Sequence, residues 1–427
     1  MITIKYPDKK EWNKLIQRPV ASQQELSELV KTIFSEVKKD GDKAISKYNL
    51  LFDKTAAKSF AVSDKAIEAS TKNVSKELRQ AIKLAMGNIE KFHKAQREIK
   101  KVVETTKGVI CWRESRAIEK VGIYIPGGSA PLFSTVLMLG IPAKIAGCKE
   151  IILCTPPDKN GNVNPAILFT ANLIGITKIY AVGGIQAIGA MTFGTKTILK
   201  VDKIFGPGNQ YVTAAKQAAQ NFGVAIDMPA GPSEVLIIAD KSCKPEFVAA
   251  DLLSQAEHGA DSQVILLSND VAVISKTLKE VAKQLTQLPR KEIATKALEN
   301  SKAIIFKTID ECIEFSNDYA PEHLILAIKN YKKFIPEVRN AGSVFLGNYS
   351  CESAGDYASG TNHTLPTNGY ARNYSGVSLD SFVKKITFQE LTEEGISNLG
   401  PSIELMAAAE QLMAHKNAVT VRLNNLK

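Results

Sequence analysis

The chain has 427 residues and a net charge of +10, and 44% of its residues are hydrophobic and 23% charged. This length and composition indicate a globular protein with more than one domain, and they exclude the disordered and fibrous classes. The lysines are spread along amphipathic segments instead of forming one basic stretch. We therefore expect no binding to nucleic acid.

No segment has the pattern of an export signal or a membrane span. The chain does not open with a basic segment followed by an apolar run, and no stretch reaches about 18 consecutive apolar residues. We expect a cytoplasmic protein without a membrane partner. The six cysteines have no CxxC spacing, and none has an adjacent histidine or a run of cations that would lower its pKa. They are expected to be free thiols without a catalytic role.

The first third of the chain is polar at its start and then helical. Residues 1–18 are mostly polar, with Trp12 as the largest apolar anchor, and predict an arm that packs on another part of the molecule. Apolar residues then recur at three- and four-residue spacing over residues 25–34 and 78–92, which predicts two amphipathic helices. His93 follows the second helix among lysines, and we expect it to be solvated.

From Val121 onward, short β-rich runs alternate with helical segments. Runs of this kind begin near residues 121, 150, 178, 203 and 224, and a second series begins near residues 235, 263 and 303. Alternation of this type predicts parallel sheets with helices on both faces. The fold class is therefore α/β, with two open, mostly parallel, incomplete Rossmann-like sheet domains and small extensions at both ends of the chain.

Three glycine-containing turns follow predicted strands. They are Gly127-Gly128-Ser129, Gly183-Gly184-Ile185-Gln186 and Gly206-Pro207-Gly208-Asn209. Glycine lets the backbone approach a phosphate closely at a helix N-terminus, but none of the three is a complete GxGxxG fingerprint. Each turn is compatible both with a tight turn and with a dinucleotide contact.

Gln255 and His258 resemble half of a metal site. An amide oxygen and an imidazole three residues apart share one face at the end of a helix. The other ligands would come from distant segments. The histidines from which they could come are few: the chain has only His93, His258, His323, His363 and His415.

Three later segments carry further candidates. Glu322 and His323 precede a strand, and because neighbouring residues of an extended segment point to opposite sides, we expect them to serve different partners or steps. Residues 353–367 are too small and polar to form a core, and Asp356 and His363 favour a loop wrapped around a ligand. The last helix carries Glu410 and His415.

In combination these segments resemble the histidinol dehydrogenase family. The resemblance runs in unbroken order from about Val121 to Val421. It rests on Tyr124–Leu132, Gly206–Asn209, Ala230–Glu234, Gln255–Gly259, Ala320–Leu324, Ala354–Thr367, and Glu410 with His415.

The resemblance implies a reaction and a set of residue roles. The reaction is the NAD-dependent oxidation of L-histidinol to L-histidine through L-histidinaldehyde, consuming two NAD+ and one water. The implied Zn2+ ligands, with one ion per subunit, are Gln255, His258, Asp356 and His415. The implied acid–base residues are Glu322 and His323. The implied substrate contacts are Ser233, Gln255, His258, His323, Asp356, His363, Glu410 and His415, and the implied NAD contacts are Tyr124, Gln186 and Asn209.

The same resemblance suggests a domain division and a homodimer. Residues 1–18 would be an N-terminal arm, residues 19–123 with 235–378 a first α/β domain carrying the metal and acid–base residues, and residues 124–234 a second domain that binds NAD. Residues 379–427 would be a tail that reaches the partner subunit, because this segment has too little apolar surface to fold alone. The two active sites would then be shared between subunits.

Two other functional classes stay open at this point. A zinc hydrolase would use the same ligand types with Glu322 as general base, but it has no need of glycine turns on two dinucleotide-like sheets. A non-catalytic metal- or nucleotide-binding module has no need of Glu322 and His323. Production of NADH from histidinol, with and without Zn2+, distinguishes the three.

Overall fold

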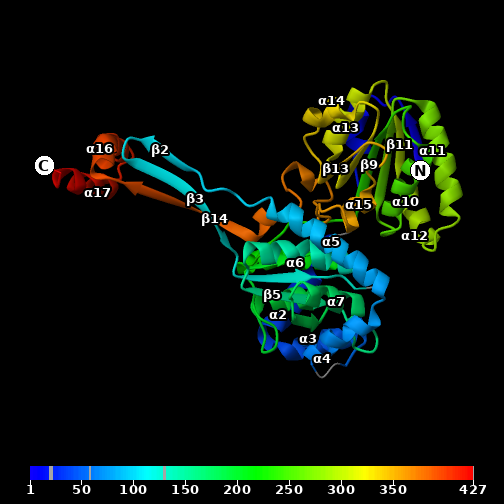
Figure 1. Cartoon of the computed structure of the whole chain (residues 1–427), viewed down its shortest axis with the longest axis horizontal. Coiled ribbons are helices and arrows are strands. Elements are labelled where there is room, and N and C mark those ends of the chain that lie inside the picture. Colours follow the sequence, from blue (N-terminus) through cyan, green and yellow to red (C-terminus); the bar gives the residue numbers. More distant parts are fainter. Residues whose placement is uncertain (19–22, 57–58, 128–130, 427) are drawn as a thin grey trace.

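The computed structural model describes residues 1–18, 23–56, 59–127 and 131–426. Figure 1 shows two α/β lobes side by side and a long arm that projects from the lower one. Within the described residues, each lobe is built on a parallel sheet and the arm on an antiparallel sheet. The predicted α/β class, with mostly parallel sheets flanked by helices, is confirmed.

The first lobe contains a six-stranded parallel sheet in the order β1-β11-β10-β9-β12-β13. All residues of β9, β10 and β12, three of its four inner strands, are buried, as expected for parallel strands covered on both faces. Its strands are β1 (Ile2–Lys5), β9 (Glu234–Ala239), β10 (Gln263–Ser268), β11 (Lys302–Ile305), β12 (His323–Ala327) and β13 (Ser343–Leu346).

Alternation along the strands divides the first lobe into two hydrophobic layers. Val235 and Ile237 of β9 pack in one layer, and Leu236 and Ile238 pack in the other. The first layer contains helices α10 (Pro245–Ala256), α11 (Val271–Leu285) and α12 (Lys291–Glu299). The second contains α1 (Trp12–Leu15), α13 (Ile309–Tyr319) and α14 (Tyr331–Phe334).

The N-terminal residues belong to this first lobe. Strand β1 pairs in parallel with β11 at the edge of the sheet. The ring of Trp12 is buried, with its centroid 5.3 Å from that of Phe306 and 5.4 Å from that of Phe315. The segment predicted as an arm is thus an edge strand followed by an aromatic anchor.

The second lobe contains a five-stranded parallel sheet in the order β6-β5-β4-β7-β8. One face packs against α6 (Phe133–Ala146) and α7 (Pro165–Leu173). The other packs against α8 (Gly184–Phe193) and α9 (Gln210–Ala219). Its strands are β4 (Lys120–Tyr124), β5 (Glu150–Thr155), β6 (Lys178–Ala181), β7 (Lys203–Phe205) and β8 (Ala225–Ile226).

The early helices lie on the second lobe, which differs from the expected assignment of residues 19–123 to the first domain. Helices α2 (Gln23–Asp40) and α3 (Asp42–Tyr48) share a core with β4 and α8. Helix α5 (Lys76–Lys94) packs on α6 and α7, and α4 (Asp64–Ala69) packs on α7. The physical reason is that the apolar face of α2 packs on α8 and α9, and the apolar face of α5 packs on α6 and α7, so both helices cover the helical layers of this lobe.

The expectation of a solvated His93 is wrong. This side chain is fully buried at the last turn of α5, and its Nδ1 lies 2.9 Å from the Ile89 carbonyl oxygen. Its Nε2 lies 3.4 Å from the amide nitrogen of Asn362. The lysines next to it in sequence lie on other faces of the helix. Their exposure therefore does not predict whether the face that carries His93 is exposed or buried.

The arm combines two segments that are far apart in the sequence. Strands β2 (Val102–Thr106) and β3 (Val109–Ala117) form a hairpin, and β14 (Val383–Leu391) pairs with β3 in antiparallel register from end to end. Helices α16 (Glu393–Ala409) and α17 (Met413–Asn424) follow and pack on each other. The predicted C-terminal tail therefore folds together with residues 102–117.

Two further observations concern the whole described chain. None of its helices is both long and apolar enough to cross a lipid bilayer. All six cysteines are free thiols, in agreement with their spacing in the sequence.

Candidate active site and metal centre

Helix α10 brings Gln255 and His258 together. The helix ends at Ala256, and the His258 N–H then donates to the Gln255 carbonyl oxygen at 3.2 Å. Gln255 is fully buried, yet neither atom of its side-chain amide has a hydrogen-bond partner. An unpaired buried amide costs about 1–3 kcal/mol, so this position is one that a bound group would complete.

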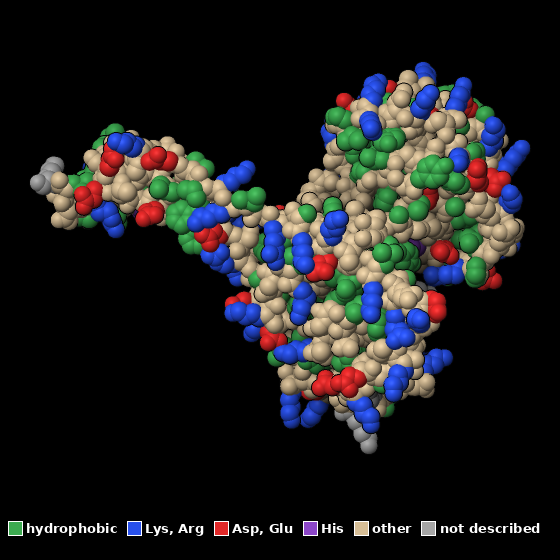
Figure 2. Space-filling view, viewed as in Figure 1, with side chains coloured by type: hydrophobic (Ala, Val, Ile, Leu, Met, Phe, Trp, Pro, Cys, Tyr) green, Lys and Arg blue, Asp and Glu red, His purple; other side chains and the backbone are tan. Residues whose placement is uncertain are grey.

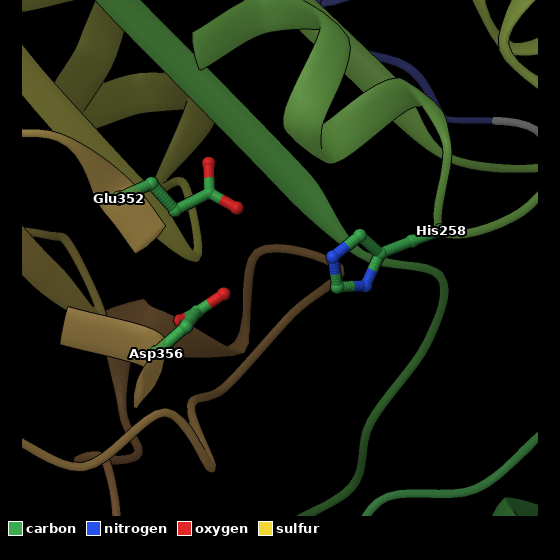
Figure 3. A group of neighbouring side chains, drawn as sticks. All are labelled: His258, Glu352 and Asp356. Atoms are coloured by element: carbon green, nitrogen blue, oxygen red, sulfur yellow. The ribbon is translucent and has the colours of Figure 1, made fainter. Parts of the chain in front are cut away.

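Helix α15 (Glu352–Tyr357) supplies two carboxylates to the same place. Glu352 and Asp356 are one helical turn apart and therefore share a face. One ligand atom from each of them and one from His258 all lie within 4.8 Å of one another. Figure 3 shows these three side chains around a common space. Nitrogen and oxygen donors in this arrangement are suited to a divalent cation.

Glu352 was missed by the sequence-based reasoning. We expected residues 353–367 to form a loop, but the segment opens as a helical turn that starts at Glu352. The four-residue spacing of Glu352 and Asp356 was the available signal, because it places two acids on one helical face. The many small residues around them concealed it.

The acid–base candidates lie beside this cluster and are both bound to the main chain of Glu234. Glu322 Oε2 accepts a hydrogen bond from the Glu234 N–H at 2.8 Å. His323 Nδ1 lies 3.2 Å from the Glu234 carbonyl oxygen, to which it donates. On its other side, His323 Nε2 lies 3.4 Å from Asp356 Oδ1. This chain of contacts connects Glu322 to the carboxylates of α15.

The expectation that Glu322 and His323 point to opposite sides is wrong. His323 Nδ1 lies 3.6 Å from Glu322 Oε2, so the two side chains are neighbours. Strand β12 begins only at His323, and Glu322 lies before the regular alternation of the strand starts. Ala320 has φ of 53°, which turns the chain sharply just ahead of the pair. Both groups can therefore act on one substrate.

Burial and mutual charge perturb this pair. Burial raises the pKa of Glu322 to about 8, against the opposing effects of His323 and of the Glu234 N–H. Burial alone would lower the pKa of His323, but the carboxylates of Glu352, Glu322 and Asp356 outweigh it and raise that pKa well above its ordinary value. Acids and bases perturbed in this way are typical of sites that transfer protons.

His363 connects the cluster to the second lobe. Its Nδ1 donates to the Asp356 main-chain carbonyl oxygen at 2.8 Å, and its Nε2 lies 3.0 Å from the Thr135 hydroxyl of α6. The carbonyl fixes the proton on Nδ1, so Nε2 accepts from Thr135 in the neutral ring. Ser233 is half-buried immediately before β9 and next to Glu234.

The three cofactor candidates lie at or after the carboxyl ends of β4, β6 and β7. The Tyr124 hydroxyl accepts from the Gly184 N–H at 3.1 Å. The Gln186 amide donates to Asn49 Oδ1 at 3.2 Å, while its Oε1 is buried without a partner. Asn209 caps α9 with its side-chain oxygen. This edge of a parallel sheet is where nucleotides bind in related architectures.

The turn at Gly206 is held by a buried ion pair. Lys216 Nζ lies 2.5 Å from Asp227 Oδ1, and Asp227 Oδ2 accepts from the Gly206 N–H at 2.8 Å. Gly206 has φ of 129°, and a Cβ there would meet the Tyr124 carbonyl oxygen at 2.1 Å. Of the predicted turn Gly127-Gly128-Ser129, the last two residues lie outside the described residues.

Glu410 and His415 do not join the cluster within one chain. Glu410 follows the last residue of α16 and His415 lies in α17, so the expectation that the last helix carries both is wrong; both side chains are exposed. Figure 1 shows these helices at the far end of the arm, away from α10 and α15.

Comparison with known proteins identifies the family. The profile of the histidinol dehydrogenase family matches residues 16–423. The histidinol dehydrogenase of Bacteroides thetaiotaomicron is 59% identical over the full length of both chains. The crystal structure of histidinol dehydrogenase from Elizabethkingia anophelis is 67% identical, covers 100% of this chain and 98% of its own, and gives a TM-score of 0.98.

A more distant likeness concerns the fold alone. An acetylating aldehyde dehydrogenase from Geobacillus thermoglucosidasius is 13% identical, with 89% of this chain and 94% of its own covered and a TM-score of 0.51. The family match, the close relatives and the arrangement of Gln255, His258, Glu322, His323 and Asp356 lead to one assignment. This chain belongs to the histidinol dehydrogenase family of oxidoreductases.

Proposed function

We propose that the chain catalyses the NAD-dependent oxidation of L-histidinol to L-histidine through L-histidinaldehyde, with Zn2+ positioning the substrate. The observation that carries this proposal is the buried acid–base pair Glu322 and His323 beside the donor cluster on α10 and α15. Family membership supports the proposed substrate, and the geometry supports the proposed roles of the residues.

The donor set fits a divalent metal. The Gln255 amide and Asp356 Oδ1 are buried without hydrogen-bond partners, and His258 offers a nitrogen within 4.8 Å of the Asp356 ligand atom. We assign Gln255, His258 and Asp356 as ligands from this chain, with Glu352 close beside them and His415 from a second copy. These nitrogen and oxygen donors would hold Zn2+, which would supply coordination for the imidazole and amine of the substrate and so position its alcohol carbon.

His323 is the group that takes the alcohol proton. Its Nδ1 proton is committed to the Glu234 carbonyl oxygen, and its Nε2 is buried without a hydrogen-bond partner, so Nε2 is the nitrogen that can accept once it has released its own proton. Because the surrounding carboxylates raise the pKa of His323, the population of this base form increases as pH rises. The nearby carboxylates of Glu322 and Asp356 stabilise the imidazolium that results.

Glu322 is assigned to the second oxidation, in which water adds to the aldehyde. Its Oε2 is held by the Glu234 N–H, and its other oxygen is the one we assign to the water proton. With a pKa of about 8, this carboxyl gains and loses a proton near neutral pH. Each oxidation releases a hydride, for which NAD is the acceptor.

NAD is proposed to bind at the carboxyl edge of the five-stranded sheet. Tyr124, Gln186 and Asn209 line this edge, and the unpaired Gln186 Oε1 is available to a ligand hydroxyl or amide. His363 reaches across to Thr135 of α6, so the substrate and cofactor lobes meet at this residue.

The site is proposed to be completed by a second copy of the chain. Glu410 and His415 are carried away from the cluster of their own chain, at the end of an arm with exposed apolar side chains. Figure 2 shows apolar atoms on the surface of this arm. Exposed apolar residues there include Ile386, Leu405, Met406, Leu412 and Met413. Such a surface is typical of a subunit interface, and a twofold dimer would place each arm on the partner.

A direct assay tests the proposed function. Purified protein with L-histidinol and NAD+ should form NADH and L-histidine in a ratio of two to one. Removal of Zn2+ with a chelator should abolish the reaction, and added Zn2+ should restore it. Failure to produce NADH or L-histidine with Zn2+ present would reject the proposal, and hydrolysis of an ester or amide substrate would instead favour a zinc hydrolase.

A further inference from the structure

Glu234 lies behind the acid–base pair and touches both of its members through the main chain. Its N–H donates to Glu322 Oε2 at 2.8 Å, and its carbonyl oxygen accepts from His323 Nδ1. The positions of both side chains therefore depend on the placement of one peptide at the start of β9. A shift of this peptide would move both groups at once.

The Glu234 side chain is itself buried and ion-paired to the N-terminal segment. Arg18 Nε lies 2.5 Å from Glu234 Oε1, and Arg18 Nη2 lies 2.8 Å from Oε2, a two-point pairing of guanidinium with carboxylate. The exposed fractions of the two side chains are only 10% and 2%. Burial of an ion pair has a desolvation cost, so stability alone does not account for this one.

Arg18 is anchored on the segment that leads into Glu322. Its Nη2 also donates to the Tyr319 carbonyl oxygen at 2.8 Å, and its guanidinium carbon lies 3.9 Å from the centre of the Tyr319 ring. Tyr319 is fully buried and ends α13, three residues before Glu322. Arg18 thus bridges the start of β9 to the end of α13.

The same carboxylate holds the loop that carries His363. Glu234 Oε1 accepts from the Asn368 N–H at 2.8 Å. One buried side chain therefore contacts the N-terminal segment and this loop, and its own backbone holds Glu322 and His323.

We infer that Arg18 and Glu234 form a positioning pair that fixes Glu322 and His323 relative to the substrate, an inference that rests on the proposed function. Neither residue touches the substrate in this role. Arg18 neutralises and orients Glu234, and the Glu234 peptide aims the two acid–base side chains.

The test is a double-mutant cycle between Arg18 and the residue that it positions. Arg18→Ala should lower kcat about 10- to 100-fold with the KM for NAD+ nearly unchanged, because the cofactor edge lies in the other lobe. In a His323→Ala background, the same change should lower the residual kcat by a clearly smaller factor, since one of the two groups being positioned is gone. Equal factors in both backgrounds would overturn the inference.

Three controls separate positioning from loss of fold. Lys9→Ala removes an exposed ion pair of the same N-terminal segment, with Glu314, and should leave kcat unchanged. Arg18→Lys keeps the charge but loses the two-point pairing, and should restore only part of kcat. Added guanidinium should raise the kcat of Arg18→Ala in a saturable way and leave the kcat of the wild type unaffected. The positioning pair would be rejected if guanidinium gave no rescue and if Arg18→Ala lowered kcat by the same factor with and without His323.

A measurement independent of catalysis keeps this inference distinct from the proposed function. Hydrogen exchange of the Glu234 amide should accelerate in Arg18→Ala more than exchange of the amides of β10, and low guanidinium should reverse the change. If the wild type failed to oxidise histidinol, the proposed function would be rejected, but faster exchange of the Glu234 amide in Arg18→Ala could still be observed. If exchange at Glu234 were unchanged, the positioning pair would fall even in an active enzyme.

Discussion

Lys216 donates to the main-chain carbonyl oxygen of Gly206 at 2.7 Å, ten residues away across the start of α9. The same ammonium pairs with Asp227, and both charged side chains are almost completely buried. Three contacts therefore hold the turn at Gly206 against the end of β4, where Tyr124 lies.

Replacing Lys216 should damage both stability and cofactor binding. Lys216→Met leaves the Asp227 carboxylate buried without its partner, and we expect a loss of about 3–5 kcal/mol in the free energy of unfolding. The KM for NAD+ should rise as the turn loosens. Urea denaturation and steady-state kinetics measure the two effects. Lys149→Met, which breaks an exposed pair with Glu119, is the matched control and should change neither quantity appreciably.

Glu352 should be needed for tight metal binding although the sequence did not single it out. It is buried next to Asp356 and His258, and its Oε2 has no hydrogen-bond partner. We expect Glu352→Gln to weaken Zn2+ binding about 10- to 100-fold. Competition with a chromophoric chelator measures this affinity. Glu246→Gln, on the exposed first turn of α10, should leave it unchanged, and an equally unchanged value in Glu352→Gln would remove Glu352 from the site.

The two acid–base residues should differ in the steps that they affect. His323→Ala should slow oxidation of both histidinol and histidinaldehyde, because the same base serves both. Glu322→Gln should slow aldehyde oxidation more strongly, because it removes the group assigned to the water. Single-turnover measurements starting from each substrate separate the steps. Normal aldehyde oxidation by Glu322→Gln would contradict the assignment.

Shared active sites should be visible by complementation. Mixing His323→Ala protein with His415→Ala protein, each of which should retain only a small residual activity, under conditions that allow subunit exchange, should restore about a quarter of wild-type activity. Random pairing makes half of the dimers hybrid, and each hybrid contains one intact site. If His415 served its own chain, every site would keep a lesion and no activity would return.

His93 should make stability depend on pH. Burial lowers its pKa below the ordinary value, with the Ile89 carbonyl opposing this effect. The unfolded chain therefore binds a proton first, so the contribution is present above about pH 6.5 and is lost as pH falls toward the folded-state pKa. Below pH 6.5, the wild type should lose up to about 1.4 kcal/mol per pH unit more than His93→Leu. Urea denaturation from pH 7.5 to 5.5 measures this, and parallel curves would refute it.

The sequence was sufficient for the elements whose side chains carry a periodic signal. The continuous apolar runs of β9, β10 and β5 and the alternation with helices predicted parallel sheets, and the structure has them. Gln255 and His258 were visible because both lie on one short segment. Glu352 and the burial of His93 were not, since each depends on which face of a helix meets a distant element.

Tertiary pairing explains the remaining differences. The sequence of residues 102–117 does not predict that they pair with β14, because that partner strand lies more than 260 residues further along the chain (383 − 117 = 266). The placement of α2 and α5 is likewise decided by which sheet offers a complementary apolar surface. The positioning role inferred for Arg18 depends on its contacts with Glu234 and Tyr319. No sequence pattern distinguishes a buried, ion-paired arginine in a polar segment from a solvated one.

The edge strand β1 has a consequence for synthesis of the protein. Ile2–Lys5 are synthesised about 300 residues before their hydrogen-bonding partners, Lys302–Ile305. At about 5–20 residues per second, roughly 15–60 seconds pass before the partner strand is made. The whole five-stranded lobe is completed within this interval, while the first residues of the chain have no strand to join. The lobe that contains β1 is thus the later of the two to close.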